Sequence, residues 1–223
     1  MLKNIIFEDY DIIVVNKPFG MLSCQDKKGI DKDLYNIIKE EKNCKDLAII
    51  NRLDRGVGGI VVFSKNIEAT NKLTEYMKNH RFEKRYLAIV CGLSKEEDTL
   101  IDWIMKNQRL NMSKIVNKNS SGAKEARLSY KKISQIEIDE KIYSLIDINL
   151  ETGRHHQIRA QMSNANLPLY NDTKYNKNIK RKLGNGHIGL FCYKMAFNHP
   201  KTNEYLEFIV YPKDEEMFRN FYS

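Results

Sequence analysis

The chain has 223 residues, of which 42% are hydrophobic and 30% charged, a balance typical of a globular protein and not of a disordered or fibrous one. Its formal net charge of +8 predicts a surface that attracts polyanions, although a lysine-rich proteome alone would give the same excess of positive charge. The four cysteines form no C-x-x-C pair, which argues against a zinc site or a disulfide framework and favours a reducing, cytoplasmic location.

The first part of the chain alternates short strands with two helices. Apolar, β-branched runs at 5–8 and 12–16 predict a hairpin, and runs at 47–50 and 59–65 predict two further strands. Residues 33–42 predict a short helix. From 66 to about 81, apolar residues at helical spacing predict a longer helix with Asn66 as its N-cap.

The second part is richer in strands. We predict strands at 85–91, 125–134, 142–150, 189–197 and 204–210, a helix from about 154 to 165, and a short C-terminal helix. The polar stretches 105–123 and 171–187 predict loops. Because strands dominate and helices are segregated from them, we predict an α+β fold, and we treat 1–223 as a single domain. No apolar run is long enough to cross a membrane, and early acidic residues argue against a signal peptide.

The segment NRLDRGVGG, residues 51–59, has the most unusual composition in the chain. Three of the 11 glycines lie within residues 56–59, directly after Arg52, Asp54 and Arg55. Glycines allow a positive φ and a close backbone approach, so a turn here would present Asp54 at a surface. A glycine-rich turn in which Asp54 only caps its own backbone is the structural alternative.

The segment TGRHHQIR, residues 152–159, places several polar donors at the start of the second predicted helix. Free N–H groups at a helix N-terminus favour anions, and the arginine fork matches phosphate or carboxylate. Positive side chains oppose the helix dipole there, which an anionic ligand would explain, whereas a solvated basic face is the alternative. On a helix, His155 and His156 would point about 100° apart, so we expect no metal site.

Taken together with KRYLAIVCG (84–92), these segments resemble, in the same order, motifs of the RluA family of pseudouridine synthases. The opening IIFEDYDIIVVNKPFGM, the segment LYNDTKY (169–175) and the closing FCYK…NHP are also similar to that family, so that the resemblance covers about residues 5–212. It implies a pseudouridine synthase-like catalytic domain with a large, mixed, mainly antiparallel sheet, flanking helices and a central cleft. It also implies isomerisation of uridine in RNA with no metal or organic cofactor.

The resemblance assigns roles residue by residue. Asp54 matches the catalytic aspartate, Tyr86 the active-site tyrosine, and Arg159 the arginine that pairs with the aspartate. We expect contacts with RNA, either ribosomal or transfer RNA, from Lys17, Arg52, Arg55, Arg154, His156 and Gln157. The resemblance suggests a monomer, and with no N-terminal S4-like domain expected, the catalytic domain itself would bind the RNA.

The sequence departs from the family pattern at three places. Asn51 replaces the usual histidine, Gly56-Val57-Gly58 replaces a more polar stretch, and Asn171 stands where glycine is usual. We interpret the first two as altered loop support or RNA contact, and we expect Asn171 to hold a positive φ. A catalytically silent RNA-binding or ribosome-assembly protein of the same fold is the first rival. A nucleosidase is the second, although such enzymes commonly use a pair of carboxylates.

Overall fold

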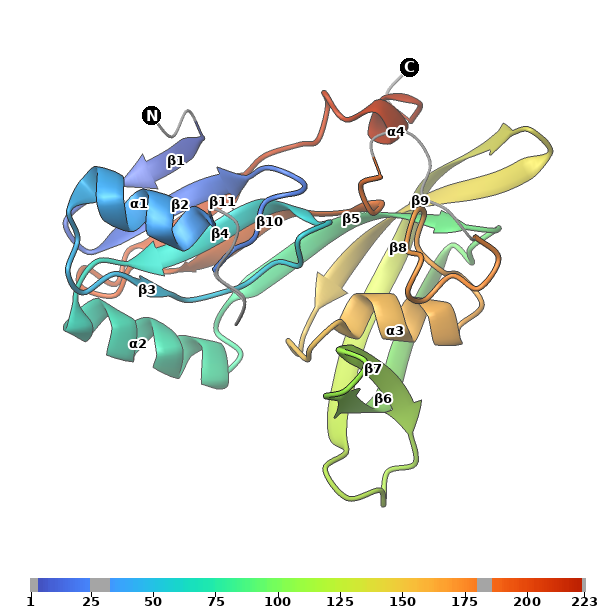
Figure 1. The fold of residues 1–223 in the computed structure, drawn as a ribbon, viewed down its shortest axis with the longest axis horizontal. Coiled ribbons are helices and arrows are strands. Elements are labelled where there is room, and N and C mark those ends of the chain that lie inside the picture. The colour runs from blue at the N-terminus through green and yellow to red at the C-terminus, as the bar shows by residue number, and fades with distance from the viewer. Residues whose placement is uncertain (1–3, 25–32, 180–185, 222–223) are drawn as a thin grey trace. The chain divides into compact units, whose positions relative to one another are not determined.

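The computed structural model describes residues 4–24, 33–179 and 186–221. It divides into two compact units (Figure 1). Unit 1 comprises Met1–Glu83 and Cys192–Tyr211, and unit 2 comprises Lys84–Phe191 and Pro212–Ser223. The description below takes each unit by itself, and the expectation that 1–223 acts as one domain stays a prediction.

Unit 1 is a sheet with two helices. Its strands β1 (Ile5–Glu8), β2 (Ile12–Lys17), β4 (Gly58–Ser64) and β10 (Leu190–Asn198) are neighbours in that order, with β3 (Ala48–Ile49) on β4 and β11 (Tyr205–Ile209) on β10. Every residue of β4 is buried, as expected for a strand between two others that is covered on both faces. Val14 pairs with Val62, which fixes the antiparallel register of β2 on β4.

The helices of unit 1 begin where their caps predict. α1 (Leu34–Lys42) has Asp33 as N-cap and buries Leu34 and Ile38. α2 (Ile67–Lys78) packs on β4, and the Asn66 side chain accepts a hydrogen bond from the backbone N–H of Ala69. The predicted N-cap at Asn66 is therefore confirmed.

Unit 2 is built on the strand order β5 (Glu83–Cys91), β9 (Lys141–Leu150), β8 (Lys124–Ile138), β6 (Glu97–Asn107) and β7 (Met112–Val116). The pairings β5–β9, β9–β8, β8–β6 and β6–β7 are all antiparallel. The helix α3 (Gln157–Asn164) packs against β6 and β7 (Figure 1), and α4 (Glu216–Arg219) lies near the C-terminus. Ala160 of α3 forms a buried cluster with Ile104, Ala126 and Tyr175.

The prediction of a loop over 105–123 is wrong in part. β6 extends to Asn107 and β7 covers Met112–Val116, which together make a hairpin. This hairpin is only half buried, so its strands carry exposed lysines that conceal the alternation from the sequence. The other predicted strands and helices are confirmed within a few residues, and 171–179 contains neither a helix nor a strand.

Candidate active site

Asp54 lies in unit 1, on a turn between β3 and β4. Its backbone carbonyl accepts a hydrogen bond from the N–H of Val57 at 3.0 Å, which closes the turn. Leu53 and Val57 are buried on either side of it, whereas Asp54 is partly exposed. The local sequence thus anchors the turn with two apolar side chains and presents the carboxylate between them.

A second segment of unit 1, residues 18–23, braces this turn. The Ser23 hydroxyl donates to the carbonyl of Leu53 at 2.9 Å and accepts from its N–H at 3.0 Å. The N–H of Gly20 donates to the carbonyl of Arg55, and Arg55 Nε donates back to the carbonyl of Gly20. Reciprocal bonds on both sides of Asp54 fix the backbone that carries the carboxylate.

Asn51, the departure from the family histidine, also supports the turn. Its buried amide donates to the carbonyl of Ile60 at 3.1 Å and accepts from the N–H of Val62 at 2.7 Å. The side chain therefore ties the strand entering the turn to β4. This geometry favours loop support over RNA contact at Asn51.

The glycines after Asp54 serve strand packing. Gly58 and Gly59 are the first residues of β4, and both are buried. Gly59 has φ +117°, and a Cβ there would lie 2.2 Å from the carbonyl oxygen of Cys192. Only glycine fits where β4 and β10 approach so closely.

Lys17 lies in the interior of unit 1 with 0% of its surface exposed, although we expected it to contact RNA. Its Nζ donates to the carbonyls of Pro18 and Met21 at 3.0 and 2.8 Å. Burial lowers the pKa of the Lys17 ammonium from 10.5 to about 7, and the negative charge of Asp54 opposes that shift. This placement favours a role in shaping the 18–22 segment beside Asp54.

The other predicted catalytic residues lie in unit 2. Tyr86 is on β5 opposite Ile148 of β9, and it is 7% exposed. Its neighbour Arg85 forms an ion pair with Asp147 through Nη2, with a second bond from Nε at 3.2 Å. Since Asp54 belongs to unit 1, its pairing with Arg159 stays a prediction.

Arg159, on α3, has a carboxylate partner that the sequence analysis did not assign. Its Nε and Nη2 both donate to the carboxylate of Asp172, each at 2.7 Å. Both side chains are buried, with 6% and 0% exposed. The preceding Asn171 has φ +59°, which confirms the positive φ expected there. The LYNDTKY motif contained Asp172, so the signal was present, but spacing alone could not name its partner.

The basic segment before α3 is a turn and not the first turn of the helix. His156 is the N-cap residue with φ +50°, and α3 begins at Gln157. The rings of His155 and His156 stack with centroids 3.9 Å apart, so the expectation that they point far apart is wrong because neither is helical. Arg154, whose Nε donates to the carbonyl of Glu125, is partly exposed.

Gln157 was expected to contact RNA, but it is only 3% exposed. Its Oε1 accepts from the Thr152 hydroxyl and the Arg154 N–H, and its Nε2 donates to the carbonyl of Arg127 and to Gln161. These bonds use both ends of the amide. Its position favours a role in holding the turn that carries Arg154 and the two histidines.

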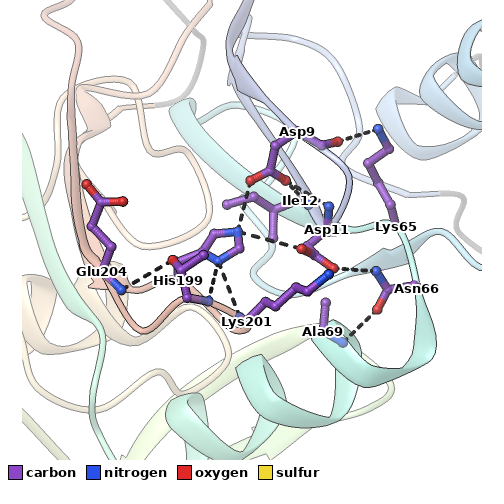
Figure 2. Close-up of polar contacts among 10 residues, drawn as sticks. Asp9, Asp11, Ile12, Lys65, Asn66, Ala69, His199, Lys201 and Glu204 are labelled. Carbon is purple, nitrogen blue, oxygen red and sulfur yellow. Dashed lines mark hydrogen bonds and ion pairs between the residues drawn. The ribbon is translucent and has the colours of Figure 1, made fainter.

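Within the described residues, one group of side chains has the spacing of a metal site: Asp9, Asp11 and His199 in unit 1 (Figure 2). His199 Nδ1 accepts from the backbone N–H groups of Lys201 and Thr202, so the hydrogen-bond network assigns the proton to Nε2. Nε2 then donates to Asp9 at 2.9 Å. Asp11 accepts from Asn66, the N-cap of α2. These three side chains therefore form a hydrogen-bonded cluster, because the imidazole nitrogen that faces the carboxylates carries a proton.

Comparison with known proteins agrees with the motifs. Residues 11–164 match the family model described as RNA pseudouridylate synthase. The chain is 31% identical to tRNA pseudouridine synthase C of Haemophilus ducreyi, over 91% of this chain and 88% of that protein. It is 28% identical to ribosomal large subunit pseudouridine synthase C of Buchnera aphidicola, over 99% and 70% of the two chains.

The fold agrees as well. The solved structure of human RNA Pseudouridylate Synthase Domain Containing 1 matches with a TM-score of 0.77 and 21% identity, over 94% of this chain and 83% of that one. In the part of the chain that the structure describes, no helix is long and apolar enough to span a membrane. With its motifs, its sheet and 154 consecutive residues matched by the family model (11–164 inclusive), the chain belongs to the RluA-type RNA pseudouridylate synthases.

Proposed function

We propose that this protein isomerises specific uridines of a ribosomal or transfer RNA and that Asp54 supplies the catalytic carboxylate. The observation that carries the proposal is the braced turn, on which two reciprocal pairs of hydrogen bonds flank a partly exposed Asp54. The matched family segment 11–164 includes Asp54, Tyr86 and Arg159. Relatives named for transfer RNA and for the large ribosomal subunit support these two substrate classes.

The reaction breaks the N1–C1′ bond, turns the uracil, joins C5 to C1′ and removes the C5 proton. A stacked uridine exposes none of these atoms, so the nucleotide must first leave the stack, at a cost of a few kcal/mol. Asp54, as an ionised carboxylate, either attacks the nucleotide directly or removes a sugar proton. The guanidinium of Arg159 would favour the charged form and orient it.

Tyr86 would stack on the displaced uracil and take part in the late removal of the C5 proton. Its aromatic ring offers a face for a base, and its phenol offers a polar group near the chemistry. A Tyr86→Phe protein should keep its affinity for RNA but slow the final proton loss. Full turnover by that variant would remove the phenol from the mechanism.

Exposed basic side chains would hold the RNA. Arg52 and Arg55 flank Asp54 and are both exposed, while Arg154 and His156 line the turn before α3. Phosphate contacts by such groups give most of the affinity of a nucleic-acid-binding protein. Lys17 and Gln157 would act behind this surface, since both are buried among protein partners.

The test measures tritium release from [5-³H]uridine-labelled transfer RNA and ribosomal RNA fragments. Asp54→Asn should lower the single-turnover rate roughly 1,000-fold or more, while RNA affinity stays within about threefold. Asp46→Asn makes the same chemical change at an exposed position of unit 1 outside the turn, so it should retain the wild-type rate.

Two outcomes would support the rival functions. The protein would be a catalytically silent RNA-binding protein if it binds RNA but releases no tritium, and if cells grow equally well with the wild type and with the Asp54→Asn variant. Free uracil among the products, in place of an isomer of unchanged mass, would indicate a nucleosidase. The synthase needs no metal or organic cofactor under this proposal. Four free cysteines are in keeping with the cytoplasmic location that we expect, and the family resemblance suggests a monomer.

A further inference from the structure

We propose that Asp172 and Tyr175 form a seat for the guanidinium of Arg159, and that both act as positioning residues for the reaction. This inference rests on the proposed function of Arg159. All three residues belong to unit 2, so the seat is described entirely within one compact unit.

The first wall of the seat is the carboxylate of Asp172. It receives the Nε and Nη2 groups of Arg159 in a two-bond fork, the geometry that fixes both the position and the plane of a guanidinium. The backbone N–H of Lys174 also donates to Asp172 Oδ1 at 3.2 Å, which orients the carboxylate. The fork uses the Nε–Nη2 edge of the guanidinium, so the carboxylate sets the direction in which the whole group faces.

The second wall is the ring of Tyr175. The Arg159 guanidinium carbon lies 5.0 Å from the ring centroid, within the range of a cation–π contact. The Tyr175 hydroxyl accepts from the N–H of Ser113 in β7 at 2.6 Å and forms a second hydrogen bond with His156 Nδ1 at 3.0 Å. The ring is thereby fixed from its far end.

One short turn carries both walls. The N–H of Tyr175 donates to the carbonyl of Asp172 at 3.1 Å, and that of Asn176 donates to the same carbonyl at 2.7 Å. Both bonds hold Asp172 and Tyr175 at a fixed separation along this turn. The positive φ of Asn171 sets the chain into this turn.

A stabilising role alone does not account for this arrangement. A buried ion pair contributes little net stability compared with apolar residues of similar volume, because both charges lose their hydration. Replacing either Arg159 or Asp172 alone deprives the other, a buried charge, of this ion pair, which is destabilising. The arrangement therefore favours a positioning role, in which the Arg159 guanidinium is held at one place and in one plane.

The experiment uses the Arg159→Ala protein, in which the seat keeps its carboxylate and its ring. We expect Arg159→Ala to lower the single-turnover rate about 100-fold, the loss that a misplaced catalytic group causes. Ethylguanidinium should raise the melting temperature of this variant and restore roughly tenfold or more of the lost rate of tritium release. In Arg159→Ala/Asp172→Asn, ethylguanidinium should change neither quantity. The matched control Arg159→Ala/Asp98→Asn alters a partly exposed carboxylate of the same unit and should keep the full rescue.

Equal rescue with and without the Asp172 carboxylate would overturn the proposal. If Arg159→Ala does not fold, Asp172→Asn in the otherwise unchanged chain decides: we expect turnover to fall while RNA affinity holds, and undiminished turnover would refute the seat. If the wild-type protein releases no tritium from any RNA, the proposed function fails, whereas the melting-temperature comparison still tests the seat.

Discussion

Gly59 gives the sharpest prediction about the strand that follows the Asp54 turn. A Cβ at this position would lie 2.2 Å from the Cys192 carbonyl oxygen and 2.6 Å from its backbone nitrogen, whereas ordinary contact begins near 3.4 Å. Gly59→Ala must therefore force β4 and β10 apart by about an ångström, which costs about 1–3 kcal/mol as overpacking. The positive φ adds about 1–2 kcal/mol for a residue with a side chain. We expect a loss of about 4 kcal/mol in the free energy of unfolding.

Gly20→Ala is the matched control, because Gly20 has φ +80° but no atom within 4 Å of its Cβ position. That variant should lose only the conformational part, about 1–2 kcal/mol. Thermal unfolding followed by circular dichroism measures both, and a protein of this size should lose about 10 °C at Gly59 and a few degrees at Gly20. Equal melting temperatures for the two variants would refute the close approach of β4 and β10.

Three further predictions concern polar and basic side chains around the turn. Lys17 has a pKa of about 7 in the folded protein against 10.5 in the unfolded chain, so its contribution to stability rises from pH 7 to about 10. In urea titrations, the free energy of unfolding of the wild type minus that of Lys17→Met should rise over this pH range. Parallel pH profiles for the two proteins would contradict this expectation. Asn51→Leu should cost about 2 kcal/mol, because it leaves a buried carbonyl and a buried N–H of β4 without a partner; an unchanged urea midpoint would argue against that bracing role. Arg52→Ala should weaken RNA binding and lower the salt dependence by about one counterion, with Lys45→Ala as the exposed control in filter binding; the same salt slope in both variants would remove Arg52 from the phosphate contacts.

The secondary structure of unit 1 could be predicted because local signals agree with the fold. The apolar runs of β1 and β2 fall on a hairpin, and Asn66 caps α2 as its position before an apolar stripe indicates. The β6–β7 hairpin was missed because its stability depends on packing against α3, distant in sequence. Its strands alternate exposed and half-buried residues, so their apolar pattern is weak.

The candidate site shows the same limit. The glycines that follow Asp54 were enough to place it on a turn, and an asparagine at a position where glycine is usual was enough to give Asn171 a positive φ. Sequence could not show that Gln157 points into the protein, because its burial depends partly on Arg127, a partner on β8 that is distant in sequence. Local polarity predicts exposure, and only tertiary contacts can reverse that expectation.

Five polar side chains that the structure places in the protein interior have one property in common. Lys17, Asn51, Gln157, Arg159 and Asp172 are buried polar side chains, and each forms hydrogen bonds with named protein partners. Burying such groups brings little net stability even when they are fully bonded, and an apolar interior would be at least as stable. Each of them fixes a backbone turn or a charged group next to a residue of the proposed mechanism. It follows that substitutions in this set should separate turnover from RNA affinity more cleanly than substitutions of the exposed arginines, which hold the RNA in the ground state and the transition state alike.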